Sequence, residues 1–207
     1  MRRFFTESDR VEAFSDGVIA VIITIMVLEL RPPQTTDARA LLQVWPTFAA
    51  YALSFTFVGI YWNNHHHMLR ATRGVDGRAM WANLHLLFWL SLVPFATAWL
   101  GRNPSATWPT ALYATILLLC AIAYTLLQHA LSAVNGRDSA FAAAVQTDVK
   151  GLVSLGLYVL ALGLSFVNTV AADIIFVGVA IMWLVPDRRF EPLIAVTGEK
   201  TGHEQSA

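Results

Sequence analysis

Charge is scarce in this chain: Asp, Glu, Lys and Arg make up 14% of its 207 residues, against about 25% in an ordinary soluble domain. Lys plus Arg and Asp plus Glu number 14 each, so the formal net charge is zero. This balance excludes nucleic acid as a partner, because nucleic acid requires a concentrated basic face. Hydrophobic residues form 56% of the chain and the mean hydropathy is +0.54, values that indicate a membrane protein.

Motifs of soluble enzymes are also missing. The sequence has no Walker loop, dinucleotide-binding fingerprint, HExxH metal motif or GxSxG nucleophile motif. Its single cysteine, Cys120, lies in an apolar run, so an intrachain disulfide is impossible and a thiolate metal site is not expected. We therefore expect no cofactor and no resident metal.

Hydrophobic segments recur along the chain, and a helix needs about 20 residues to cross the hydrocarbon core. We predict an all-α membrane domain over 1–190 with six transmembrane helices, followed by a disordered tail over 191–207. The helix boundaries are predicted at 12–30, 41–68, 79–100, 109–133, 149–167 and 171–186. Pro94 should kink the third helix, a short helix is expected over 141–147, and 168–173 should form a tight hairpin. Acidic residues near the first segment favour a retained helix over a cleaved signal peptide.

The distribution of Lys and Arg predicts the orientation in the membrane. With six spans, one side collects Arg2, Arg3, Arg10, Arg70, Arg73, Arg78, Arg137, Lys150, Arg188, Arg189 and Lys200. The other side has Arg31, Arg39 and Arg102. Both termini are therefore predicted to face the cytoplasm of a cell whose plasma membrane holds the protein.

The first hydrophobic segment carries an unusual polar group at its start, Arg10, Glu12, Ser15 and Asp16. A carboxylate at the edge of hydrocarbon persists there when it has a partner or a function. Further along, Gly17, Val21, Thr24 and Leu28 fall on one narrow stripe of a helix. Two interpretations stay open: a seam of small residues for helix packing, or one wall of a pore that several subunits surround.

Arg10-x-x-x-Phe14-Ser15-Asp16, followed by Gly-Val-Ile-Ala-Val-Ile-Ile-Thr-Ile-Met-Val-Leu, resembles the signature of the bacterial TMEM175 family. The six-span unit and the Trp62-Asn-Asn-His-His-His67 end of the second segment extend the resemblance. Members of that family are six-helix potassium channels. The resemblance implies a potassium-selective homotetramer in the lipid bilayer, without enzymatic activity, whose first helices line a central pore.

The resemblance also assigns roles on the first helix. It implies that Val21 forms the pore constriction, that Thr24 forms the selectivity layer and that Leu28 forms a further apolar layer. Relatives usually carry Ile or Leu at the constriction, so the shorter valine would widen the neck. From the helical wheel, Ile22 and Met26 are expected on the opposite side of the helix.

We interpret the polar residues near the motif as a latch that fixes the first helix at the inner mouth of the pore. The alternative is that they only satisfy one another's hydrogen bonds at an interface between helices. The proposed partners of Asp16 are His65, His66, His67 or Asn63, and His85 is expected at the same depth. Three consecutive histidines on a helix point in different directions, so they cannot share one metal ion. A site that joins one of them to His85 or His129, and a proton-sensitive latch, remain open. The rival function is a membrane-embedded metal-dependent enzyme or metal transporter using His65–His67 and Asp16.

Overall fold

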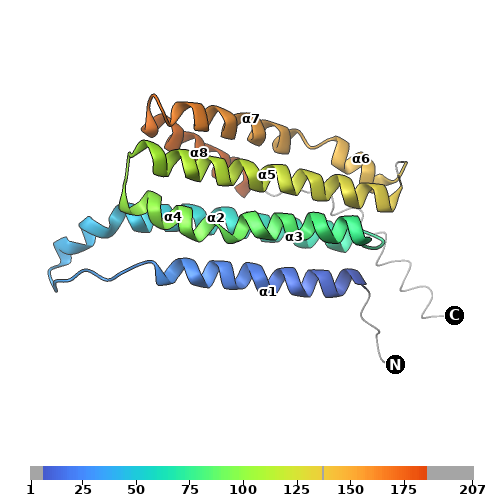
Figure 1. Ribbon diagram of the computed structural model, residues 1–207, viewed down its shortest axis with the longest axis horizontal. Coiled ribbons are helices and arrows are strands. Elements are labelled where there is room, and N and C mark those ends of the chain that lie inside the picture. Colours follow the sequence, from blue (N-terminus) through green and yellow to red (C-terminus); the bar gives the residue numbers. More distant parts are fainter. Residues whose placement is uncertain (1–6, 137, 186–207) are drawn as a thin grey trace.

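The computed structural model describes residues 7–136 and 138–185, and every regular element in these ranges is helical (Figure 1). The elements are α1 (Glu7–Leu28), the 3-10 helix η1 (Ala38–Ala40), α2 (Leu41–Ala71), α3 (Gly77–Ser91), α4 (Val93–Arg102), α5 (Thr107–Asn135), α6 (Ala140–Gln146), α7 (Val149–Leu164) and α8 (Thr169–Leu184). The all-α prediction is confirmed for these residues. The predicted tail over 191–207 and the domain limit at 190 lie outside them.

Local sequence explains where several helices begin and end. Asp76 and Asp148 cap α3 and α7, each accepting a hydrogen bond from a backbone N–H three residues on, at 2.8 and 2.7 Å. Pro94 divides the third predicted segment into α3 and α4, which meet at Leu92, because proline lacks an N–H and clashes with the preceding turn. The kink expected there is therefore confirmed.

The last hairpin is shorter than predicted. The residues between α7 and α8 are 165–168, and Asn168 caps α8 by accepting a hydrogen bond from Ala171 N at 3.1 Å. Asp173 consequently lies inside α8 rather than in the hairpin, so the predicted hairpin over 168–173 was wrong. The asparagine cap sets the start of the helix at Thr169, two residues before the predicted boundary at 171.

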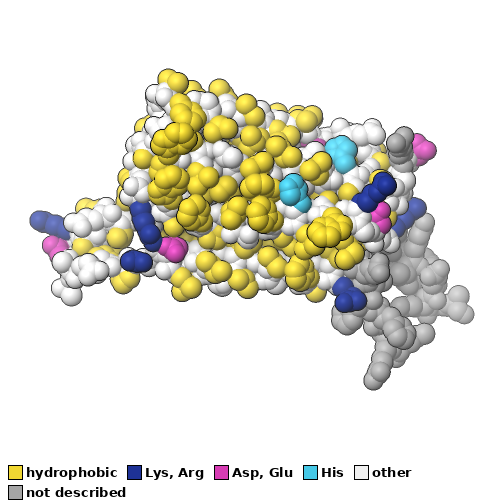
Figure 2. Space-filling model, viewed as in Figure 1, with side chains coloured by type: hydrophobic (Ala, Val, Ile, Leu, Met, Phe, Trp, Pro, Cys, Tyr) yellow, Lys and Arg dark blue, Asp and Glu magenta, His cyan; other side chains and the backbone are white. Residues whose placement is uncertain are grey.

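Five stretches of helix are long and apolar enough to cross a membrane: Ser8–Leu28, Ala38–Ala71, Gly77–Arg102, Thr107–Asn135 and Ala140–Leu164. The sixth, α8, is apolar but has 16 residues. Figure 2 shows hydrophobic side chains over the middle of the molecule, with charged side chains toward the two ends of its long axis. This distribution fits a protein whose middle lies in hydrocarbon.

The helices form layers, with α1 at one edge of the molecule and α7 at the other (Figure 1). α1 packs against α2, α3 and α4, whereas α5 lies centrally and contacts α3, α4, α7 and α8. We call the end at which α1 begins the basic end; it holds the α2–α3 and α5–α6 loops together with Arg10, Arg70, Arg73 and Arg78. At the opposite end, the first part of α2 extends beyond the other helices (Figure 1).

Polar contacts and close backbone approach hold α2, α4 and α5 together. Ser54 of α2 accepts a hydrogen bond from Thr97 of α4 at 2.7 Å and shares one with Tyr113 of α5 at 2.8 Å. Near the opposite end, a Cβ added at Gly101 would lie 2.7 Å from Thr47 Cα, so only glycine fits this crossing of α2 and α4. The resulting core is a rigid support against which α1 packs on one side.

Candidate functional site

α1 has two faces with different surroundings. Ile19, Ile22 and Met26 are 1–4% exposed and pack into the hydrophobic core of the subunit. Val21 and Leu28, on the opposite side, are 55% and 77% exposed, and Gly17 and Thr24 share that exposed face. We call Gly17, Val21, Thr24 and Leu28 the outward stripe. The structure thus places them on one face and Ile22 and Met26 on the other.

The outward stripe is apolar except at one level. Thr24 lies on it, and its Oγ1 donates a hydrogen bond to the carbonyl oxygen of Val21 at 2.9 Å. The hydroxyl hydrogen is therefore engaged with the backbone, and the oxygen lone pairs remain available on the exposed face. At a rise of 1.5 Å per residue, the stripe from Gly17 to Leu28 extends about 16 Å along the helix axis.

A groove of about 960 Å³ runs beside this stripe, between α1 and α4. Its walls include Phe14, Val21 and Ile25 of α1 and Phe95 and Trp99 of α4. Phe14 is 55% exposed and Phe95 is 63% exposed. A large apolar groove next to an exposed apolar helix face is typical of a surface that another helix covers.

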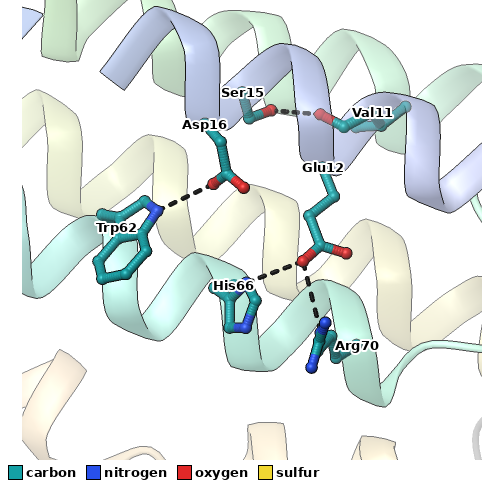
Figure 3. A network of polar contacts seen from close by, with 7 residues as sticks. All are labelled: Val11, Glu12, Ser15, Asp16, Trp62, His66 and Arg70. Atoms are coloured by element: carbon teal, nitrogen blue, oxygen red, sulfur yellow. Dashed lines mark hydrogen bonds and ion pairs between the residues drawn. The ribbon is translucent and has the colours of Figure 1, made fainter. Parts of the chain in front are cut away.

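Near the basic end, α1 and α2 are joined by a carboxylate cluster (Figure 3). Asp16 accepts a hydrogen bond from Trp62 Nε1 at 2.9 Å, one turn away from the contacts of Glu12. Glu12 Oε1 lies 2.8 Å from His66 Nδ1 and 3.5 Å from Arg70 Nε. We call Glu12, Asp16, Trp62, His66 and Arg70 the inner cluster; its contacts fix the first turns of α1 against α2.

A second polar chain connects α1 and α2 to α3. His65 Nε2 donates to Asn83 Oδ1 at 2.7 Å, Asn83 Nδ2 donates to Ser15 Oγ at 2.9 Å, and Ser15 Oγ donates to Val11 O at 2.8 Å. His65, Asn83 and Ser15 are 0%, 2% and 0% exposed. Because buried polar groups are costly when unpaired, this chain orients all three side chains.

The histidines do not converge, and Asp16 takes its hydrogen bond from Trp62 rather than from an expected partner, although His66, one of those expected, lies nearby. Asp16 bonds to Trp62, whereas His65 reaches Asn83 and His66 reaches Glu12. His85 is exposed and accepts a hydrogen bond from Trp89 of its own helix at 2.8 Å, so it lies outside the inner cluster. The reason is helical geometry: successive residues point about 100° apart, so neighbours in sequence meet different partners.

His67 and His129 do not join these contacts either. The ring of His67 lies 5.7 Å from that of His66, and its Nδ1 has no hydrogen-bond partner among the described residues. His129 contacts Thr125 O, on its own helix α5, at 2.7 Å. A metal site that combines one of the three consecutive histidines with His85 or His129 is therefore not supported.

The other two residues of the motif face outward. Arg10 is exposed and lines a small groove with Phe14, Met80 and Leu84 between α1 and α3. The motif is thus divided, with Ser15 and Asp16 directed into the subunit and Arg10 and Phe14 directed away from it.

At the other end of α1, Glu29 forms an ion pair with Arg102 of α4, with both side chains more than 40% exposed.

Sequence reasoning missed Trp62 and Arg70 as members of the inner cluster. A signal was available, because Trp62, His66 and Arg70 repeat every four residues and therefore share one face of α2. Glu12 and Asp16 share a face of α1 through the same spacing. What the sequence could not show is that these two faces meet.

Comparisons with known proteins show which proteins this chain resembles. The family model described as endosomal/lysosomal potassium channel TMEM175 matches residues 10–94, which include most of α1, the inner cluster and α3. A potassium channel from Chryseobacterium sp. is 47% identical over 182 residues, covering 88% of this chain and 95% of that protein. A potassium channel from Streptomyces collinus is 36% identical over 174 residues, covering 78% of this chain and 84% of that protein.

Among solved structures, the chain is similar to the crystal structure of a lysosomal potassium-selective channel TMEM175 homologue from Chamaesiphon minutus. The TM-score is 0.75 at 32% sequence identity, and the match covers 86% of this chain and 97% of that chain. Both the sequence over nearly the full length and the helical arrangement are therefore shared with these channels. The chain belongs to the TMEM175 potassium channel family.

Proposed function

We propose that this protein is a potassium-selective cation channel whose pore is lined by the outward stripe of α1 from four subunits. The observation that carries the proposal is the exposed apolar face of α1, with one hydroxyl layer at Thr24. The relatives that match over most of their length are named potassium channels. They favour a channel over the rival metal-dependent enzyme or metal transporter.

The pore requires an oligomer, because one α1 cannot enclose an ion path. Four copies placed around an axis would bury the outward stripe and fill the groove between α1 and α4 with a neighbouring subunit. This arrangement removes the exposure of Phe14, Val21 and Leu28, which the single subunit leaves uncovered. Exposed apolar surface of this extent beside a groove supports such an assembly.

Permeation follows from the chemistry of the stripe. A ring of Val21 side chains would form the narrowest apolar neck, and such a constriction can close by losing its water. One turn further, the Thr24 oxygens would offer lone pairs that partly replace the hydration shell of a cation. Leu28 would form a second apolar ring nearer the opposite end.

The orientation follows from charge. Of the described residues, Arg10, Arg70, Arg73, Arg78 and Lys150 belong to the side that we assign to the cytoplasm, and Arg31, Arg39 and Arg102 belong to the other. This bias favours a plasma-membrane protein with both termini in the cytoplasm. The inner cluster then lies at the cytoplasmic mouth, where it would act as the latch that holds α1.

The test is potassium flux into liposomes that contain the purified protein, measured with and without a metal chelator. We expect potassium-driven flux that the chelator does not abolish, and slower flux with sodium. The test variant Thr24→Val keeps the shape of the side chain and removes its hydroxyl, so it should conduct with weaker discrimination between potassium and sodium. Absence of flux from a correctly folded protein would overturn the proposal.

A further inference from the structure

The inner cluster gathers a set of metal-ligating groups in addition to its hydrogen bonds. One ligand atom each from Glu12, Asp16 and His66 lies within 4.8 Å of the others. In the described ranges, 7–136 and 138–185, these are the residues that meet this criterion as a group of three or more. They come from two helices, since Glu12 and Asp16 are one turn apart on α1 and His66 faces them from α2 (Figure 3).

We propose that Glu12, Asp16 and His66 form a binding site for a divalent transition metal ion such as Zn²⁺. Two carboxylates and one imidazole, with a water in the fourth position, are a donor set that tetrahedral zinc accepts. The nitrogen ligand favours Zn²⁺, Co²⁺ or Ni²⁺ over Mg²⁺ and Ca²⁺, which prefer oxygen ligands. The i, i+4 spacing of the two carboxylates presents both from one side of a helix, as ligand pairs require.

The surroundings of His66 Nδ1 suit a nitrogen atom that binds a metal ion. Its Nδ1 is shielded from solvent and has no hydrogen-bond partner among the described residues, although it lies 2.8 Å from Glu12 Oε1. A metal ion between these atoms would separate them by roughly 3.3 Å, given metal–ligand distances of about 2.0–2.1 Å. Trp62, which donates to Asp16 Oδ1 at 2.9 Å, would orient that carboxylate from outside the ligand set.

Arg70 is the natural competitor of the metal. Its Nε lies 3.5 Å from Glu12 Oε1, and its side chain is 58% exposed while that of Glu12 is 16% exposed. A cation at the site would repel the guanidinium, which can move into solvent. Removing this charge should therefore strengthen metal binding, an effect that a purely structural ion pair does not predict.

Metal binding would connect α1 to α2 through three coordinate bonds. The binding itself does not depend on channel activity, whereas any effect of the metal on potassium flux rests on the proposed function. Because α1 carries the outward stripe, a metal that holds its first turns should restrict movement of the pore wall. We expect Zn²⁺ on the cytoplasmic side to reduce flux.

The experiment measures Zn²⁺ binding to the full chain in detergent, after removal of any purification tag, by equilibrium dialysis against Zn²⁺, with Mg²⁺ as the comparison ion. The expected result is one site per chain that Mg²⁺ does not occupy. His66→Gln removes a ligand and should weaken binding about tenfold or more. His67→Gln, the adjacent histidine outside the cluster, should bind as wild type.

Arg70→Gln keeps all three ligands, so it still tests the site if His66→Gln fails to fold. It should tighten Zn²⁺ binding by roughly fivefold, the effect of removing a unit charge at this distance in a well-solvated site. Equal binding by the His66 and His67 variants, or unchanged or weaker binding by Arg70→Gln, would overturn the site. Since these measurements involve no ion flux, loss of the channel proposal would leave their outcome unaffected.

Discussion

On one side of α1, Ile19, Ile22 and Met26 are almost completely buried; half a turn away, Val21 and Leu28 are mostly exposed. Both faces are apolar, so hydrophobicity does not distinguish them. The difference lies in what each face meets. One is covered by the rest of the subunit, and the other is left uncovered by it, as the proposed position at the pore axis requires.

Other exposed apolar faces show what is particular to the outward stripe. On α7 and α8, Val159 and Ile181 are 58% and 60% exposed, as expected for side chains in contact with lipid. The outward stripe of α1 is as exposed but contains the hydroxyl of Thr24, and a groove lies beside it. The hydroxyl layer and the groove are the features on which we base the proposal that this face meets neighbouring subunits rather than lipid.

The largest difference between the two faces of α1 should be seen by cross-linking, because a cysteine on one face should form a disulfide between subunits and a cysteine on the other should form none. In a Cys120→Ala background, Val21→Cys should form intersubunit disulfides on mild oxidation, because the narrowest ring brings its copies closest together. A disulfide requires Cβ atoms about 3.5–4.5 Å apart. Ile22→Cys, buried within its own subunit, is the control and should remain monomeric on denaturing gels. Intersubunit disulfides from Ile22→Cys but not from Val21→Cys would show that the face carrying Ile22 lies at the axis, and would contradict the account.

A second comparison concerns stability. Met26→Ala leaves a cavity in the packed face and should lower the free energy of unfolding by about 2–5 kcal/mol, with ion preference unchanged. Val21→Ala trims an exposed side chain, and the loss of stability should be smaller. Unfolding of both variants in detergent measures the difference. Equal losses would show that both faces are packed alike.

A third prediction compares the two carboxylates at the ends of α1. Asp16→Ala leaves the Trp62 N–H without its acceptor and should destabilise the protein by about 1–3 kcal/mol. Glu29→Ala breaks the exposed pair with Arg102 and should change stability by about 0–1 kcal/mol. Thermal unfolding and potassium flux should both fall more for the Asp16 variant. Similar, mild effects would count against the latch.

Much of the fold could be predicted from the sequence, because hydrophobic length and helix-breaking residues act locally. The break near Pro94 and the short α6 follow from such signals. The start of α8 at Thr169 was missed because the Asn168 cap lies before a continuous apolar run that conceals the boundary. The two faces of α1 were also predictable, because a helix fixes the relative directions of its own side chains.

Contacts between helices could not be predicted in this way. The pairing of Asp16 with Trp62, rather than with a histidine, depends on the rotation of α2 about its axis. In the observed rotation, His65 hydrogen-bonds to Asn83 of α3 and Met68 is buried in the hydrophobic core. The contact of His85 with Trp89, by contrast, follows from their spacing of four residues on α3, and that local signal was overlooked.

The most direct test of the central claim, that the outward stripe lines the pore, is the potassium-to-sodium permeability ratio in planar bilayers. Val21→Ala removes two methyl groups from each subunit and should raise flux and lower the ratio, and Thr24→Val should lower the ratio while assembly is kept. Ile22→Val and Met26→Leu, on the buried face, are the controls and should keep the wild-type ratio. If the Val21 and Thr24 variants match these controls, the outward stripe does not line the pore.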